Sequence, residues 1–436
     1  MNFDFVSLFN KENPRRFDLY LILLSIFYVI FLQPYSISVW GSGVSINYLF
    51  LLIPVTLLVV RKELVFPHIF IIAPIIFFSV QFLIAITFSG DGSYILTRRF
   101  LSFCSFMSVF ALCFVRFDGR HLRAFKIALI FSALYLSVNQ YGKLLSLHYP
   151  HTLEIEGFDL NKGFITFSDI LFKLNTWFLK DVIGSSRTGF IYVSAFFVIL
   201  LSDFFRGRFL YVKSVVLFLI AVGLTMTYAR ATIITMFLTL VLFLFFYFRG
   251  LMGFRLHKKH FQAFLFFCFL YLLFCILHPG VVYFYVERFV LLYLSPEALA
   301  GELNNLSSSE GTRISEWRHI IVETVRRPFL GSGFIGVWNT KVDLIGSAHN
   351  QFFDVMYRTG FAGLTIYFFL TVITGLALFK VDKALFFVLA ACVLFGLFHE
   401  SFKESHGAFI FAMLLWVSSD YYKSKRRFDT EAKFDR

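Results

Sequence analysis

Long apolar segments recur along this chain, and they restrict its fold more than any other feature. A helix of about 20 apolar residues spans the hydrocarbon core of a bilayer. Candidate segments lie at residues 17–33, 45–60, 68–88, 100–115, 122–142, 188–202, 209–227, 231–248, 261–280, 352–379, 384–398 and 407–420. Only 15% of the residues are charged, whereas soluble domains carry roughly 25%. We therefore predict an all-α, polytopic integral membrane protein with about twelve transmembrane helices, formed as one membrane domain over residues 1–436.

Basic residues set the orientation of such a protein, because cytoplasmic loops retain Lys and Arg. When the N-terminus is placed inside, the basic clusters at 116–123 and 249–259 and the C-terminal tail also fall inside. Both termini are therefore predicted to be cytoplasmic. Two long loops, 143–187 and 281–351, then lie outside. The net charge of +13 is explained by this asymmetry and by attraction to anionic lipid headgroups, so it requires no nucleic acid partner.

The second outer loop contains a predicted amphipathic helix from Thr312 to about Arg326. Apolar residues recur there at three- and four-residue steps and form one stripe, made of Ile314, Trp317, Ile321 and Val325. Thr312 is the expected N-cap, and Pro328 ends the helix. We expect this helix on the outer membrane surface or across the mouth of the helix bundle. Arg313 then falls in the first turn, where the helix dipole disfavours a cation, which favours an anionic partner for this side chain.

Three glycines follow in the segment RRPFLGSGFIGVW, namely Gly331, Gly333 and Gly336. Glycine permits close backbone approach and unusual dihedral angles. Two interpretations are open, a phosphate-cradling loop or a flexible re-entry of the chain into the bilayer. The spacing matches no nucleotide motif and lacks the Lys-Ser/Thr ending, which favours re-entry.

A His-Asn pair stands just before the tenth apolar segment, in GSAHNQFFDVMYRTG. If Asn350 caps that helix, His349 precedes the cap, where the positive end of the helix dipole favours the neutral, proton-accepting imidazole. The same helix end attracts anions. Asp354 and Arg358, four residues apart, are expected to pair on the helix surface. On these residues alone, His349 is either a functional group or an ordinary interfacial side chain.

Together these elements resemble the signature region of the O-antigen ligase and O-antigen polymerase superfamily. The matching positions, in chain order, are Arg313, Trp317, Pro328, Gly331, Gly333, His349, Asn350 and Gly360. Upstream, TYARATIITMFL is similar to the family's Ser-Arg element, with Arg230 as its arginine, and SSRTGF gives Arg187 a looser match. The detailed resemblance covers residues 187–365. Two positions depart from it, because Ala229 replaces the usual Ser and Arg358 stands where many members carry an acidic residue.

The resemblance implies a glycosyltransferase that moves a glycan from a polyprenyl diphosphate to an acceptor hydroxyl, without a metal or another cofactor. It implies His349 as general base, in the catalytic loop 281–351, and Arg230 and Arg313 as cations that stabilise the leaving diphosphate. Expected substrate contacts come from Arg187, Asn350, Trp317, Gly333 and Glu404. The expected location is the bacterial inner (plasma) membrane, with the active site and both long loops on the periplasmic face. Expected partners are the lipid-linked glycan and membrane lipids, and a polysaccharide chain-length regulator is a candidate partner.

Three functions remain open at this point. The chain is a polymerase of lipid-linked O-antigen or a similar surface polysaccharide, a ligase that moves finished glycan to lipid A–core, or a transporter of lipid-linked sugars. The sequence has no internal repeat, which speaks against transport. We favour the polymerase, because the polymerases of the superfamily are the more divergent members and the match here is patchy.

Two other polar groups need an interpretation. Arg98 and Arg99, at the outer end of the fourth apolar segment, are expected at lipid headgroups, with diphosphate binding as the alternative. The segment HESFKESH, residues 399–406, has Lys403 where a His-Glu-x-x-His metal motif needs its second histidine. Glu400 or Glu404 is therefore a candidate for contact with the acceptor sugar, and no metal ligand is predicted.

Overall fold

The computed structural model describes most of the chain from residue 66 onward, together with one short hairpin. The described residues are 36–39, 42–45, 66–88, 90, 92–114, 119–148, 189–201, 210–227, 229–251, 258–286, 309–336, 348–400 and 405–434. The predicted apolar segment 17–33, nearly all of 45–60 and most of the first outer loop lie outside these residues.

Every predicted apolar segment from residue 68 onward coincides with a helix in the described part of the chain. Among the described residues the fold is therefore helical apart from one antiparallel hairpin, in which β1 (Ser36–Val39) pairs with β2 (Ser42–Ser45). Packing divides the chain into two compact units, a subdivision that the sequence did not predict. The first unit includes Phe117–Val282, and the second comprises Ser36–Arg116 and Tyr283–Arg436.

The first unit is built around a buried helix. Its helices are α5 (Gly119–His148), α8 (Gly189–Leu201), α9 (Leu210–Thr225), α10 (Arg230–Phe248) and α11 (Lys258–Leu277), followed by α12 (Pro279–Tyr285) at its boundary. Helix α8 is buried from Gly189 to Ile199, and α5, α9 and α10 pack against it. A helix that is apolar all round is expected in such a central position. Helices α5 and α9 approach closely at Gly223, where an added Cβ would lie 2.6 Å from the Ser137 Cα.

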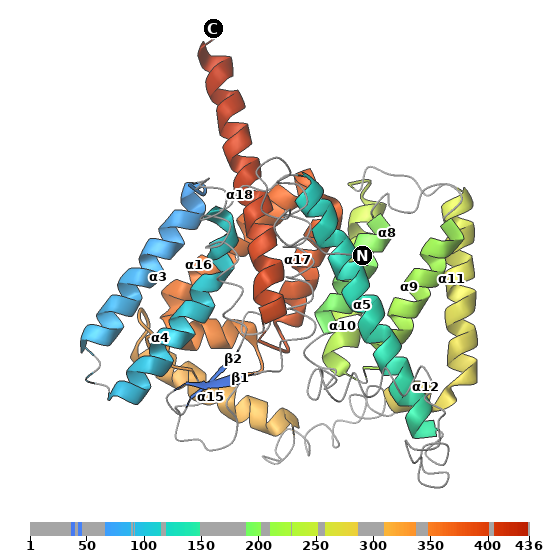
Figure 1. Cartoon of the computed structure of the whole chain (residues 1–436), viewed down its shortest axis with the longest axis horizontal. Coiled ribbons are helices and arrows are strands. Elements are labelled where there is room, and N and C mark those ends of the chain that lie inside the picture. The colour runs from blue at the N-terminus through green and yellow to red at the C-terminus, as the bar shows by residue number, and fades with distance from the viewer. Residues whose placement is uncertain are drawn as a thin grey trace, which may run out of the picture. The chain divides into compact units, whose positions relative to one another are not determined.

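The second unit is arranged around α16. Its helical elements are α3 (Ile69–Phe88), α4 (Ser93–Met107), η4 (Ser108–Phe114), α15 (Ser309–Arg326), α16 (Gln351–Val381), α17 (Lys383–Phe395) and α18 (Ser405–Phe434). Helix α16 packs against α3, α15, α17 and α18, and α18 also packs against η4. In Figure 1, α15 runs at a steep angle to α18. The long helix α16 is therefore the element that connects α15 to the rest of this unit.

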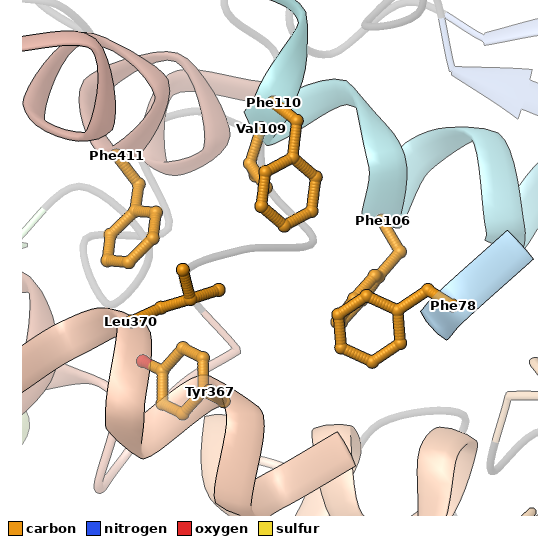
Figure 2. A pocket seen from close by; sticks show the side chains of 7 residues that line it. All are labelled: Phe78, Phe106, Val109, Phe110, Tyr367, Leu370 and Phe411. Carbon is orange, nitrogen blue, oxygen red and sulfur yellow. The ribbon is translucent and has the colours of Figure 1, made fainter. Parts of the chain in front are cut away.

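Aromatic side chains fill the interior of the second unit. The ring of Phe334 is fully buried and lies edge-on to the rings of Phe78, Phe103 and Phe106. Beside these rings a small cavity opens between α3, α4, η4, α16 and α18 (Figure 2), lined by Phe78, Phe106, Val109, Phe110, Tyr367, Leu370 and Phe411. No charged group lines this cavity, so it does not bind a diphosphate.

Three described helices, α3, α10 and α16, are long and apolar enough to cross a membrane. Helices α4 and η4, bent by 43° at their junction, would make a fourth span if they are taken together. Large apolar side chains such as Phe237 on α10 and Phe269 on α11 are exposed, which suits contact with lipid. The chain is therefore a membrane protein, whereas the number of about twelve spans stays a prediction.

Candidate functional site

The predicted helix start at Asn350 is confirmed. Asn350 is the N-cap of α16, and its Oδ1 accepts hydrogen bonds from the backbone N–H groups of Phe352 at 2.9 Å and Phe353 at 3.1 Å. These two bonds satisfy donors that a helix N-terminus leaves without intrahelical partners. The Nδ2 of Asn350 donates to the carbonyl oxygen of Leu397 at 2.8 Å. The side chain therefore both begins α16 and ties it to the segment that follows α17.

His349 stands immediately before this cap in a left-handed backbone conformation, with φ of 47°. A non-glycine residue adopts this conformation uncommonly, so its neighbours must hold it there. Ala348, fully buried, is bonded on both sides. Its N–H donates to Oε1 of Glu400, and its carbonyl oxygen accepts from Nε1 of Trp317 at 2.9 Å. The backbone that leads into His349 is therefore fixed by two side chains distant in the sequence.

The segment after α17 forms the other wall of the turn. Besides the bonds to Leu397 and Glu400, the backbone N–H of Gln351 donates to the Gly396 carbonyl oxygen at 2.7 Å. The ring of His399 lies 5.9 Å from that of His349, at 76°, and stacks on Phe395 at 5.2 Å. His399 was considered from the sequence only as part of a metal motif. Within the described residues, no three His, Cys, Asp or Glu side chains come together as a metal site would need.

Helix α15 begins three residues earlier than predicted. It starts at Ser309, so the prediction of Thr312 as N-cap is wrong. Arg313 is accordingly beyond the first turn, and the argument from the helix dipole no longer applies to it. The serine and glycine residues before Thr312 suggested a loop, but the helix extends through them.

Apart from Trp317, the predicted apolar stripe of α15 does not pack on the protein. Ile321 is 43% and Val325 62% exposed. The buried face instead carries Glu316, Ile320 and Thr324. Trp317 borders this face and stacks on Phe353, with 5.1 Å between ring centroids and 23° between ring planes. Arg313 is spaced three, seven and eleven residues before the three buried residues, which places it on the same side of the helix. The protein-facing side of α15 is therefore the more polar one.

The glycine-rich turn between α15 and α16 is a structural element. Its four consecutive backbone N–H groups, at Gly331, Ser332, Gly333 and Phe334, donate to the carbonyl oxygens of Arg327, Tyr357, Leu330 and Arg358 at 2.7–3.0 Å. These amides are used within the protein, so they do not form the cradle that a phosphate would need. The turn is also packed against α16 and is no loose re-entry. A substrate contact by Gly333 stays a prediction.

This turn fits into a break in α16 at Gly360. Gly360 has φ of 70° and ψ of −173° inside the helix, and the N–H of Phe361 donates to the Pro328 carbonyl oxygen at 2.7 Å. The side chain of Gln81 on α3 donates to the carbonyl oxygens of Phe329 and Thr359, both at 2.7 Å. The backbone groups that the break releases are thus bonded again by the turn and by α3.

Buried arginines support the same region. Arg358 and Asp354 pair as expected, with 2.7 Å between Nε and Oδ2, but the pair is buried and not on the helix surface. Arg358 also donates to Ser102 of α4. Arg99 is buried and donates to the carbonyl oxygens of Ser332 and Gly333. The expectation that Arg99 meets lipid headgroups is therefore wrong.

The neighbouring Arg98 lies over the ring of Tyr94, 4.8 Å from its centroid. This contact holds the guanidinium on its own helix, because the face of a phenol ring attracts a cation.

Arg230 belongs to the first unit and is the first residue of α10. Ala229, the N-cap, makes no side-chain capping bond. The Oγ1 of Thr227 accepts from the Ala229 N–H at 3.3 Å, so it bonds the amide of the N-cap residue itself. A cation in a first helical turn is disfavoured by the helix dipole. Helix stability therefore does not account for Arg230. The predicted substrate residues Arg187 and Glu404 lie outside the described residues.

These observations define the class of the protein. It is a membrane protein whose described residues are almost all helical, and a polar turn at His349 directly precedes the long helix α16. Residues 215–368 match the family model described as O-antigen ligase, which confirms the resemblance found in the motifs. Over these residues the chain is similar to the O-antigen polymerase and ligase superfamily. No curated protein matches the chain.

Proposed function

We propose that this protein is a glycosyltransferase that polymerises oligosaccharide repeat units carried on a polyprenyl diphosphate. The proposal rests above all on the turn at His349, which lies within the matched region. Trp317 and Glu400 fix this turn through hydrogen bonds to the carbonyl oxygen and the N–H of Ala348. Such fixed support is what a general base requires, because it has to stand within hydrogen-bond reach of the proton it removes.

In the proposed transfer, the acceptor hydroxyl oxygen forms the new bond to the anomeric carbon of the donor glycan. The bond between that carbon and the diphosphate oxygen breaks, and its electron pair leaves with the lipid diphosphate. His349 takes the hydroxyl proton. Diphosphate is already a good leaving group, so the reaction needs no general acid. It does need positive charge near the departing oxygens.

Arginine suits that second task, because its guanidinium binds phosphate oxygens in pairs. We propose Arg313 and Arg230 for it. Arg313 shares the face of α15 that carries Trp317, and Arg230 begins α10 where the helix dipole gives it no support. Arg187 stays a candidate on sequence grounds. Asn350 and Trp317 shape the substrate site through the turn that they hold.

The exposed stripe of α15 supports a site at the membrane surface. Ile314, Ile321, Val325 and the following Phe329 are exposed, and their side chains suit the interface of a bilayer. We propose the periplasmic face of the bacterial inner membrane, with both termini in the cytoplasm. There the protein meets the lipid-linked glycan among the membrane lipids, and a chain-length regulator is a proposed partner.

The test is a gel of surface polysaccharide and lipid-linked intermediates from a deletion strain. The strain is complemented with wild type, His349→Ala or His319→Ala, the last being a matched histidine on α15 away from its buried face. We expect lipid cores capped by a single repeat in the deletion strain and in His349→Ala, and a full ladder with wild type and His319→Ala. Bare cores with long chains left on the lipid carrier would identify a ligase. An undisturbed ladder in the deletion strain would refute both forms of transfer.

A further inference from the structure

We propose that Glu400 is the positioning residue that holds His349 in its working conformation. The proposal rests on the function proposed above, in which His349 is the base. Glu400 lies 51 residues after His349 in the sequence, in the segment that follows α17. Nothing in the spacing of the two residues indicates a link between them, but in the fold the Glu400 carboxylate accepts the N–H of Ala348, the residue before His349.

The left-handed conformation of His349 makes this bond important. A non-glycine residue at φ of 47° is held there only when the surrounding structure fixes the backbone that leads into it. The peptide that follows Ala348 is held through its carbonyl oxygen by Trp317. The peptide that precedes Ala348 is held through its N–H by Glu400. Loss of either bond allows the backbone of His349 to relax toward an ordinary conformation, which moves the imidazole.

Within the segment 396–400, Glu400 bonds to the turn at His349 through its side chain. Residues 396–400 supply three acceptors to residues 348–351, of which the carbonyl oxygens of Gly396 and Leu397 belong to the backbone and the carboxylate of Glu400 does not. Substitution can therefore remove the third bond and leave the other two in place. Substitution of Glu400 therefore tests this bond separately from the two backbone bonds.

Burial argues against the other roles considered for this carboxylate. Glu400 is only 6% exposed, and a buried carboxylate is stable where it accepts strong hydrogen bonds. A residue so placed acts within the protein and does not reach out to an acceptor sugar. The ring of His399, the residue before Glu400, lies 5.9 Å from that of His349. Glu400 therefore bonds to the turn beside the space between the two imidazoles.

The first readout is the steady-state kinetics of the full-length protein in detergent, with a lipid-linked repeat unit as substrate. A base displaced by about 1 Å loses on the order of a hundredfold in rate. We expect Glu400→Ala to lower kcat by about 30- to 100-fold with little change in KM.

Glu400→Gln keeps an acceptor oxygen at the same reach and should retain most of the activity. Glu400→Asp, one methylene shorter, should behave like Glu400→Ala and replaces it if the alanine variant fails to fold. Glu323→Ala, a surface control on α15 whose partner is Arg326, should behave like wild type.

The second readout needs no catalysis. Diethyl pyrocarbonate modifies accessible imidazoles, and mass spectrometry measures the rate at His349 with His319 as internal reference. We expect faster modification of His349 in Glu400→Ala than in wild type, with Glu400→Gln equal to wild type. If wild type shows no transfer, the proposed function fails, yet this order of rates still tests the positioning.

Two results would overturn the inference. The first is wild-type kcat and an unchanged His349 modification rate in Glu400→Ala. The second is a Glu400→Gln variant as inactive as Glu400→Ala, together with a shifted pH profile of kcat. That second result would show that the charge of Glu400, and not its bond to Ala348, is what the reaction needs.

Discussion

Replacement of Gly360 by alanine should destabilise the second unit, because α16 is broken at this residue. Gly360 has φ of 70° and ψ of −173°, a combination that is essentially restricted to glycine. An added Cβ would collide with the Pro328 carbonyl oxygen and lie 2.9 Å from the carbonyl carbon of Phe329. Both are backbone atoms of the turn that fills the break, so neither can move away without loss of the bond between Phe361 and Pro328.

The size of the effect follows from these two terms. A residue other than glycine in this backbone region costs on the order of 1–3 kcal/mol. Overpacking against backbone adds about 1–3 kcal/mol. We therefore expect Gly360→Ala to lower the free energy of unfolding by about 2–6 kcal/mol in total.

Thermal unfolding of the purified protein in detergent, followed by intrinsic fluorescence, measures this effect. In a folding unit of 150–250 residues, 1 kcal/mol moves Tm by about 2–4 °C, so a fall of roughly 4 °C or more is expected. Gly375→Ala is the matched control in the same helix, because a Cβ there meets only side-chain atoms of Leu389 and Phe386, at 3.6 and 3.8 Å. It should leave Tm unchanged or raise it slightly. Equal Tm values for the two variants would show that the break at Gly360 is not a feature of the folded protein.

Three other perturbations have defined outcomes. Arg358→Met leaves the buried Asp354 carboxylate without its ion-pair partner and should lower the free energy of unfolding by about 3–5 kcal/mol. Adding Asp354→Leu to this variant should restore most of the lost Tm, and no restoration would contradict the pairing. Asn350→Ala removes the cap of α16 and should cost about 1 kcal/mol for that term; Asn350→Asp, which keeps the capping oxygen but not the donor to Leu397, should recover part of the loss in Tm. Removal of divalent cations with EDTA should leave the rate of glycan transfer unchanged; a rate lost with EDTA and restored by one added metal would refute a metal-independent reaction.

Local sequence patterns predicted the helices and one of their ends. Hydropathy alone located α3, α10 and α16, because a span of apolar residues has few other stable conformations in a membrane. The cap at Asn350 was predictable as well, since the side-chain oxygen of an Asn immediately before an apolar run can accept from the first N–H groups of the helix. The apolar spans and the cap depend on residues that are adjacent in the sequence, so they can be predicted from it.

The supports of the site could not be predicted, because they join residues far apart in the chain. Arg99 bonds to carbonyl oxygens 233 and 234 residues away, and Glu400 bonds to an amide 52 residues away. A lone glycine in an apolar helix is often tolerated without a break, so Gly360 gave no sign of one. The stripe of α15 was identified correctly as a pattern, but Glu316 and Thr324, which pack on the protein, are polar residues that hydropathy assigns to the outside.

The two irregular places in the second unit are linked through α15. The left-handed turn at His349 depends on Trp317, in the middle of α15, and the break at Gly360 depends on the turn that begins at Pro328, just after the end of α15. A rigid helix transmits displacement along its axis, so a shift of α15 acts on both places at once. Arg313 lies on the same helix, one turn before Trp317. In the proposed reaction, the cation Arg313 and the side chain that fixes the turn at His349 therefore belong to one helix.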